Sequence, residues 1–310
     1  MGKFNRLLNS LSRNIDEHGV RGVFKTIDTA QQFSRRELRY VVRNKWQSTN
    51  VYSRDWDVLI LLDCATIEMM NEVKEDYEFI GDVEEHISPG TCSNEWMMRT
   101  FTDKYSEQMS DTLHVTANTS SDTYLNSDDF LHLEEVWKDG WNKEMGTIPA
   151  REVTDRAIYF GRKYDPERMI IHYMQPHLPF VESGIESNII TPHGVKGEGL
   201  MLGELYEEGY TKEELWRASV NNLHYVLEDL ELLLSNLDAD KAVLSSDHGQ
   251  AFGENGVWAH PCFTYIDVLR KVPWCVTSGS DTSEYQPEYE PKEVEPEIGL
   301  DEKLEALGYK

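Results

Sequence analysis

Two acidic residues that follow short apolar runs give this sequence its clearest chemical signal. Asp63 comes directly after the run 58–62, and Asp247-His248 comes directly after the run 242–246. Carboxylate and imidazole groups together ligate Zn²⁺ or Mn²⁺, whereas Mg²⁺ and Ca²⁺ favour a shell of oxygen atoms. We therefore expect one divalent metal ion where two strands end, and the residue types leave its identity open among Mn, Zn, Ca and Mg.

A turn rich in small polar residues, 88–96, supplies candidate nucleophiles. Thr91, Cys92 and Ser93 lie where a helix through residue 101 is expected to begin. Free amides and the positive end of the helix dipole suit an incoming phosphoryl or sulfuryl group, and a bound cation lowers the pKa of an alcohol. The same residue types are common helix caps, so this segment alone favours an ordinary turn and cap over a catalytic site.

Two histidines fall in loops from which they could reach such a metal site. His177 follows the apolar run 169–173 and lies between two prolines, which restrict the loop and favour a fixed side chain. His260 lies thirteen residues beyond Asp247, after a glycine-rich stretch that lets the loop turn back. His172 belongs to the strand itself, so we expect it within the sheet or packed beside it.

Apolar runs alternate with helical patterns along the chain. A continuous apolar run bounded by polar residues is typical of a strand buried on both faces of a parallel sheet. The clearest helix is expected over 211–237, where Thr211 and Glu214 form a capping box. This alternation predicts an α/β sandwich with a mostly parallel central sheet, whose ligands gather beyond the carboxyl ends of the strands. The expected strands are 58–62, 113–117, 169–173, 242–246 and 272–276.

The charge of the 310 residues is acidic and unevenly distributed. The chain carries a formal charge of -26, yet residues 1–46 hold ten basic and four acidic residues, a net +6. We expect a basic amphipathic helical extension over 1–50 and a catalytic domain over 51–310. The extension either packs as helices on the main domain or makes peripheral contact with an anionic membrane through residues 1–46.

Composition also restricts the partners and the compartment. An acidic surface repels nucleic-acid backbones, so we expect no nucleic-acid partner. The longest aliphatic run near the start, 58–62, is too short to cross a bilayer, and we find no secretory signal. Four cysteines without a CxxC pair do not indicate a disulfide framework. A reducing, cytoplasmic location, either free or associated with a membrane, is the simplest expectation.

Taken together, these segments resemble sulfatases of the alkaline phosphatase superfamily, and most of all the sulfatase-like proteins of haloarchaea. The stretches 246–256, 258–260 and 269–274 look like the C-terminal signature of that family. The resemblance covers nearly everything after residue 50. It implies an alkaline-phosphatase-like α/β/α sandwich that hydrolyses or transfers phosphate or sulfate esters. The implied substrate is an anionic ester, with a glycan or a lipid as the group it could be linked to.

The resemblance also implies which hydroxyl acts as the nucleophile. Sulfatases convert a Cys or Ser in a C/S-x-P-x-R motif to formylglycine, but Cys92 is followed by Asn94 and Trp96 at the Pro and Arg positions. Counting from Thr91 places Glu95 four residues later, which resembles the threonine-nucleophile pattern of lipoteichoic-acid-synthase-like phosphotransferases. An unmodified Thr91 and a phosphate ester are therefore expected.

The remaining roles follow the same resemblance. His177 and His260 would contact the non-bridging oxygens of the ester or assist the leaving group, as protonated imidazoles can. Departures at Cys64, Thr66 and Gln250 motivate the alternative of a non-catalytic sulfatase-like protein that binds an anionic glycan or a protein partner. The implied metal ligands are Asp63, Thr91, Asp247 and His248.

Overall fold

The computed structural model describes residues 48–181, 183–185, 190–191, 194–195, 201–264 and 266–291. The prediction for the basic extension over 1–50 falls almost entirely outside these residues. Within the described residues, no helix combines the length and the apolar character needed to cross a membrane.

Among the described residues, seven strands form one central sheet in the order β2-β11-β8-β1-β5-β3-β4. The neighbours from β8 to β4 run parallel to one another, and β11 pairs antiparallel with both β8 and β2. The predicted mostly parallel sheet is therefore confirmed. The strands are β1 (Val58–Leu62), β2 (Glu84–Ile87), β3 (Thr112–Thr116), β4 (His132–Glu135), β5 (Arg168–Tyr173), β8 (Ala239–Ser245) and β11 (Lys271–Gly279).

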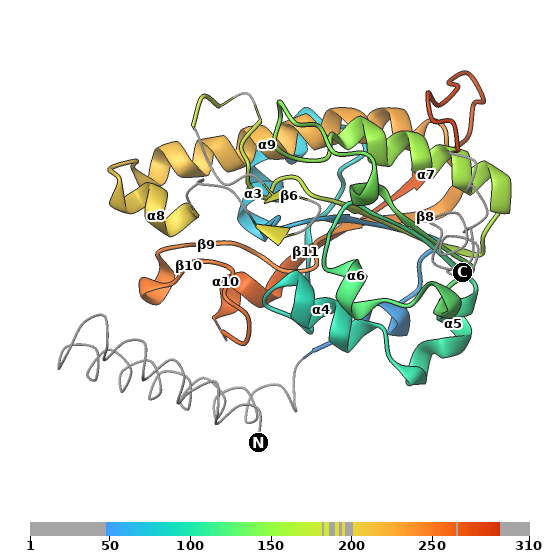
Figure 1. Cartoon of the computed structure of the whole chain (residues 1–310), viewed down its shortest axis with the longest axis horizontal. Helices are drawn as coiled ribbons and strands as arrows, with labels where there is room; N and C mark the ends of the chain where they lie inside the picture. The colour runs from blue at the N-terminus through green and yellow to red at the C-terminus, as the bar shows by residue number, and fades with distance from the viewer. Residues whose placement is uncertain are drawn as a thin grey trace, which may run out of the picture.

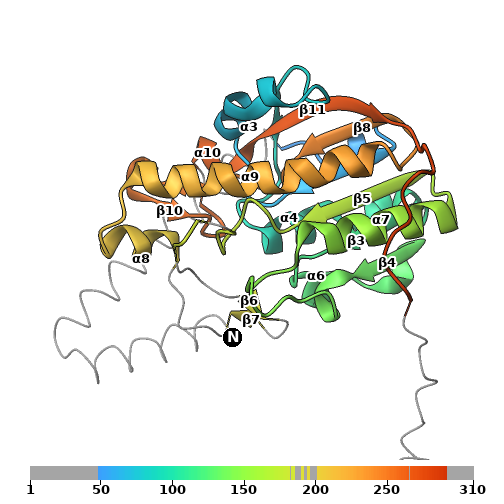
Figure 2. The same cartoon turned by 90° about the horizontal axis from the view of Figure 1, so that it is seen from above.

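Helices cover both faces of this sheet, as the α/β/α prediction requires. In Figures 1 and 2, α7 and α9 cross one face, whereas α4 and α5 lie on the other. Strand β1 is buried on both sides because Val58, Ile60 and Leu62 join one apolar core and Leu59 and Leu61 join another. The helices are α3 (Ile67–Val73), α4 (Ser93–Thr100), α5 (Ser106–Ser110), α6 (Ser121–Tyr124), α7 (Ala150–Tyr164), α8 (Leu202–Glu207), α9 (Lys212–Leu234) and α10 (Asp267–Arg270).

Shorter elements connect these layers. Two pairs of two-residue strands are antiparallel, and the pair β9–β10 carries the chain from Asp247 toward His260. The first pair is β6 (Ile190–Thr191) with β7 (Gly194–Val195), and the second is β9 (Ala251–Phe252) with β10 (Trp258–Ala259). Single-turn 3-10 helices are η1 (Val51–Ser53), η2 (Lys74–Asp76), η3 (Asp103–Tyr105), η4 (Ser127–Asp129), η5 (Val136–Lys138) and η6 (Glu254–Gly256).

The long helix α9 begins with the predicted capping box. The backbone N–H of Glu214 donates to Thr211 Oγ1 at 3.2 Å, and the backbone N–H of Thr211 donates to Glu214 Oε2 at 2.8 Å. Together these bonds satisfy two amides that the first turn leaves without helical partners. The apolar stripe of α9 is buried against the sheet and α7.

Gly249 allows the chain to leave β8 beside a second backbone segment. A Cβ atom at Gly249 would lie 2.0 Å from the backbone oxygen of Val268. We expect Gly249→Ala to lower the free energy of unfolding by about 1–3 kcal/mol or more, because the backbone must move to relieve the overlap. Chemical denaturation measures this change. Gly81→Ala is the matched control, since its Cβ would meet Val276 O at an ordinary 3.7 Å. Equal stability of the two variants would contradict the prediction.

Candidate active site

The sheet topology brings the two predicted acidic strand ends together. Strands β1 and β8 are parallel neighbours, with Leu61 opposite Ser245, so Asp63 and Asp247 follow at the same edge of the sheet. His248 Nε2 lies 3.5 Å from Asp63 Oδ1 and 3.4 Å from Asp247 Oδ2. The structure therefore groups Asp63, Asp247 and His248, which were expected to bind a metal ion.

The two acidic residues of this group are buried, and imidazole groups lie near the carboxylate of Asp63. Asp63 and Asp247 are at most 1% exposed. Burial favours the neutral form of Asp63, but nearby imidazoles, led by His248, outweigh it and lower the pKa of Asp63 to about 2. Asp247 Oδ2 finds no hydrogen-bond donor among the described residues. A buried carboxylate oxygen without a partner is costly, and a cation would compensate it.

The ring of His248 is oriented with one nitrogen toward these carboxylates. Its Nδ1 lies 3.0 Å from the backbone oxygen of Gly249, an acceptor that requires Nδ1 to carry the proton. When the ring is neutral, as a metal ligand must be, the lone pair is then on Nε2, which faces both carboxylates. A backbone carbonyl that fixes the tautomer in this way is typical of a metal-binding histidine.

His172 joins the same group, although the sequence indicated only that it lies in or beside the sheet. Its Nε2 lies 3.6 Å from Asp247 Oδ2 and 3.9 Å from Asp63 Oδ2. The side chain is fully buried, and neither ring nitrogen has a hydrogen-bond partner among the described residues. Asp63, His172 and Asp247 form one of the groups whose ligand atoms are close enough to hold a metal ion.

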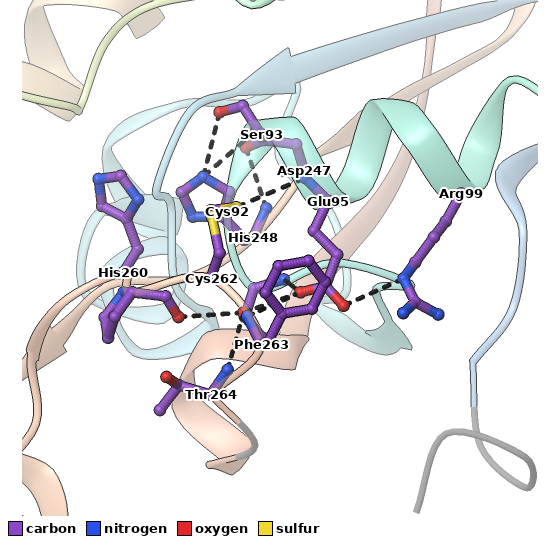
Figure 3. The surroundings of a disulfide bond; sticks show 12 residues. Cys92, Ser93, Glu95, Arg99, Asp247, His248, His260, Cys262, Phe263 and Thr264 are labelled. Atoms are coloured by element: carbon purple, nitrogen blue, oxygen red, sulfur yellow. Dashed lines mark hydrogen bonds and ion pairs between the residues drawn. A yellow bond between two sulfur atoms is a disulfide. The ribbon is translucent and has the colours of Figure 1, made fainter. Parts of the chain in front are cut away.

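Ser93, the first residue of α4, places its hydroxyl group in this cluster. Ser93 Oγ lies 3.3 Å from Asp63 Oδ2 and 3.2 Å from His248 Nε2. Figure 3 shows Ser93 beside Asp247 and His248. Asn118, which follows β3, donates to the same Asp63 oxygen at 2.9 Å. The cluster therefore combines carboxylates, imidazoles and one hydroxyl at the end of a helix.

Thr91, the predicted metal ligand and nucleophile, is hydrogen-bonded between the first turn of α4 and the 261–264 loop. Its Oγ1 lies 3.0 Å from Glu95 Oε2 and 3.2 Å from the backbone oxygen of Pro261, and it accepts a bond from the N–H of Thr264 at 3.3 Å. Glu95 also accepts from the N–H of Phe263. Thr91 thus joins the helix turn to the 261–264 loop, and its catalytic role stays a prediction.

The two loop histidines, His177 and His260, meet each other at the edge of the cluster. Their Nε2 atoms are 3.0 Å apart, and the ring of His260 stacks on that of His248 with centroids 4.5 Å apart. Burial, His248 and His177 together lower the pKa of His260 well below its usual value. His260 is therefore neutral near pH 7 in the metal-free chain, in contrast to the protonated form considered from the sequence.

Three residues depart from the sulfatase pattern, and each has a distinct place. Thr66 caps α3, because its Oγ1 accepts from the N–H of Met69 at 3.2 Å. Gln250 is buried beyond the site, and its Oε1 has no partner among the described residues. Cys64 has a positive φ of 74°, and its Sγ lies 3.2 Å from Asp63 Oδ1. Cys64 thus lies in the site. From the sequence, it was noted only as a departure from the family pattern.

A disulfide between Cys92 and Cys262 joins the start of α4 to the loop after His260. The Cα atoms are 5.1 Å apart, and 170 residues separate the two cysteines in the sequence. The expectation that the cysteines stay reduced is wrong for this pair. Spacing could not indicate the bond, because the fold alone brings the two loops together. The disulfide fixes the His260 loop to the turn that carries Ser93.

Loss of this disulfide is expected to destabilise the protein. A crosslink that closes so long a loop restricts the unfolded chain, so the Cys92→Ala/Cys262→Ala double variant should lose about 2–5 kcal/mol of unfolding free energy. Urea denaturation without reductant measures the loss. Cys275→Ala, which removes a free buried cysteine of β11, is the control for the change in side-chain volume. If the double variant were as stable as wild type and insensitive to dithiothreitol, the crosslink would not contribute.

Comparison with known proteins identifies the fold but no near relative. No family model matches the chain, and no curated protein matches its sequence. The integral membrane protein lipooligosaccharide phosphoethanolamine transferase A from Neisseria meningitidis superposes with a TM-score of 0.51 at 12% identity, over 91% of this chain and 60% of that one. The fold is shared with this transferase. The chain thus spans less than two thirds of the transferase's length.

Two other solved structures are similar at lower scores. The soluble domain of the same Neisseria enzyme gives a TM-score of 0.49 at 14% identity, over 72% of this chain and 75% of that one. A 2-O GAG sulfatase gives 0.47 at 12% identity, over 72% and 64% respectively. At such identities the comparison concerns the fold alone, and the particular closeness to haloarchaeal proteins stays a prediction.

Proposed function

We propose that this protein is a metal-dependent hydrolase or transferase of phosphate esters, with Ser93 as its nucleophile. The observation that carries the proposal is the position of Ser93 Oγ, within 3.3 Å of both Asp63 and His248. Those residues are the predicted metal ligands, and a nucleophile that shares their site can be activated there. Thr91, the hydroxyl favoured by the family pattern, is the competing assignment.

The residues of the cluster fit a divalent cation. Two buried carboxylates and the Nε2 lone pair of His248 point to one place, and Asp247 Oδ2 lacks a donor. Asp63, Asp247 and His248 would hold the ion, and His172 could add a fourth protein ligand. When bound, such an ion lowers the pKa of a neighbouring hydroxyl group and offsets charge on the ester oxygens. The mixed oxygen and nitrogen donors favour Zn²⁺ or Mn²⁺ over Ca²⁺ and Mg²⁺.

In the proposed reaction, Ser93 attacks phosphorus, and His177 and His260 contact the oxygens of the ester. Ser93 Oγ loses its proton to water and forms a bond to phosphorus, while the bond to the leaving oxygen breaks with its electron pair. The leaving oxygen takes a proton from water, and a phosphoserine at Ser93 remains. Water or an acceptor alcohol then attacks that phosphorus and restores the serine. His177 and His260, whose Nε2 atoms lie 3.0 Å apart, would contact the non-bridging oxygens of the ester.

A metal and substrate screen tests this function. The purified chain is treated with EDTA, supplied with Mn²⁺, Zn²⁺, Ca²⁺ or Mg²⁺ singly, and assayed on an aryl phosphate, an aryl phosphodiester and an aryl sulfate. We expect Zn²⁺ or Mn²⁺ to restore turnover of the phosphate esters, with weaker turnover of the sulfate. Absence of turnover under every condition, with retained binding of the anionic ester, would favour the non-catalytic alternative.

The substrate and the compartment are further parts of the proposal. The transferase with the shared fold is named for lipooligosaccharide, which agrees with an anionic ester linked to a glycan or lipid. The Cys92–Cys262 disulfide favours an oxidising compartment over the cytoplasmic one expected from the sequence.

Membrane contact through residues 1–46 is tested by comparing vesicle binding of the full chain with that of a chain that begins at residue 47.

A further inference from the structure

A cleft of about 620 Å³ lies beside the C-terminal end of α4. Its walls come from the segments 48–53 and 98–105 and from Pro89. Arg99, in its wall, lies six residues beyond Ser93 on the same helix, which is a rise of about 9 Å along the helix axis. The cleft contains none of the residues assigned above to metal binding or to catalysis.

The lining of this cleft is cationic, although the chain is acidic. None of the lining residues is acidic, whereas the whole chain holds 56 acidic and 30 basic residues. Arg99 and Lys104 supply two positive charges, and the hydroxyl groups of Ser48 and Thr102 can donate hydrogen bonds. Lys104 Nζ lies 2.9 Å from Tyr105 Oη and forms no ion pair with a carboxylate among the described residues. Such a lining favours an anionic ligand.

The guanidinium group of Arg99 is held in place at the wall of the cleft. Its Nε lies 3.0 Å from Glu95 Oε1, a contact that Figure 3 shows, and the side chain is 26% exposed. Burial and the nearby Arg270 lower the pKa of Arg99 to about 10. An anion in the cleft would offset the repulsion between these two guanidinium groups.

Asn50 joins the two walls of the cleft. Its Nδ2 donates to the backbone oxygens of Thr100 at 2.9 Å and Arg99 at 3.3 Å, and its Oδ1 accepts from the N–H of Tyr52 at 2.9 Å. The last carbonyl groups of a helix carry partial negative charge and disfavour an anion. Because the Asn50 amide donates to two of them, this unfavourable effect is reduced and the cleft is preformed.

We propose that this cleft binds a small, soluble phosphate monoester, with its phosphate group at Arg99 and Lys104 and its organic group against Met98. A doubly charged phosphate matches two cations, and a guanidinium group suits its oxygen atoms. Met98 lines the cleft and is 45% exposed, so it offers an apolar surface. The volume is within the range of about 300–1,000 Å³ that is typical of small-molecule sites, which is more than phosphate alone requires. Binding here does not depend on ester turnover at the carboxylate cluster.

Calorimetric titration of the full chain in EDTA tests this site. Without a cation, the carboxylates of Asp63 and Asp247 repel an anion from the active site, so the titration reports on the cleft. We expect phenyl phosphate to bind at one site per chain, more tightly than inorganic phosphate. Lys104→Gln should weaken its binding about tenfold, because a hydrogen bond to a charged group is lost. Met98→Ser should reduce the advantage of phenyl phosphate over inorganic phosphate.

A second lysine variant separates this site from a general effect of charge. Lys163 is exposed, as Lys104 is, and also lies over a tyrosine ring, but it belongs to α7. Lys163→Gln should change the affinity for phenyl phosphate by less than about twofold, since salt screens a distant surface charge. An equal loss of affinity in the two lysine variants would overturn the proposal, as would absence of binding at millimolar phenyl phosphate.

Vesicles distinguish a lipid headgroup from a soluble ligand. The full chain is mixed with phosphatidylcholine vesicles that contain phosphatidate, and its sedimentation with them is compared with that of Lys104→Gln. We expect the two proteins to sediment equally, because the proposed ligand is soluble. Sedimentation that Lys104→Gln abolishes, without binding of phenyl phosphate, would assign the cleft to a lipid headgroup and overturn the proposal.

Discussion

Replacing Ser93 with alanine should lower kcat for the preferred phosphate ester by at least about 10³-fold, because the attacking oxygen is lost. Metal binding should persist, since Asp63, Asp247 and His248 remain. Thr91→Ala should behave differently. It removes buried hydrogen bonds with Glu95 and the 261–264 loop, so we expect a loss of about 1–3 kcal/mol in unfolding free energy. Its kcat should fall only modestly. Steady-state kinetics and denaturation of both variants measure the contrast.

The two variants are matched, since each removes one hydroxyl group from the same turn. Trapping the intermediate adds an independent readout: after incubation with an aryl phosphate and acid quenching, phosphate should be recovered on Ser93 by mass spectrometry. Phosphate on Thr91, together with activity that survives Ser93→Ala but not Thr91→Ala, would restore the nucleophile that the family pattern favours.

Replacing Asp247 with asparagine should abolish the thermal stabilisation that the cation at the carboxylate cluster provides. An ion that binds only the folded state stabilises it by about 2.7 kcal/mol at a hundred times its dissociation constant. Asp247→Asn removes the carboxylate whose Oδ2 has no donor among the described residues. The metal-free variant should therefore be at least as stable as metal-free wild type, while its Tm should respond far less to Mn²⁺. Differential scanning calorimetry with Mn²⁺ or EDTA measures both effects.

Asp229→Asn provides the control for removing a buried carboxylate elsewhere. Asp229 lies on α9 and pairs with Arg151 Nε, so its loss should lower the Tm with and without metal alike. The rise in Tm on adding Mn²⁺ should equal that of wild type. A full Mn²⁺ response in Asp247→Asn, or an equally reduced response in Asp229→Asn, would show that the carboxylate cluster does not bind the ion.

Strands with continuous apolar runs were predictable, whereas polar edge strands were not. The run 58–62 coincides with β1, and its residues are buried on both sides. Local composition was therefore sufficient to predict this strand. Strands β2 and β4 lie at the two edges of the sheet and carry partly exposed, charged residues. They lack the apolar signal, because an edge strand with one open side does not need it.

The hydroxyl group that reaches the cluster could not be read from the turn alone. Thr91 and Ser93 are two residues apart, and either hydroxyl group could act as a nucleophile or as a helix cap. The direction of each side chain depends on how α4 packs, with Trp96 fully buried against the sheet. His172 shows the same dependence. Alternation along β5 places it on the face of Ile170, which is the face that α4 covers.

The sequence by itself determined the parallel sheet and the meeting of Asp63 with Asp247-His248, because apolar runs define buried strands and the ends of parallel strands share one edge. Only the tertiary structure decided that Ser93, His172 and Cys64 join them, and that Cys92 pairs with Cys262. Those contacts join residues from separate loops and strands. Their distances depend on how helices and loops pack across the sheet, which local residue patterns do not specify.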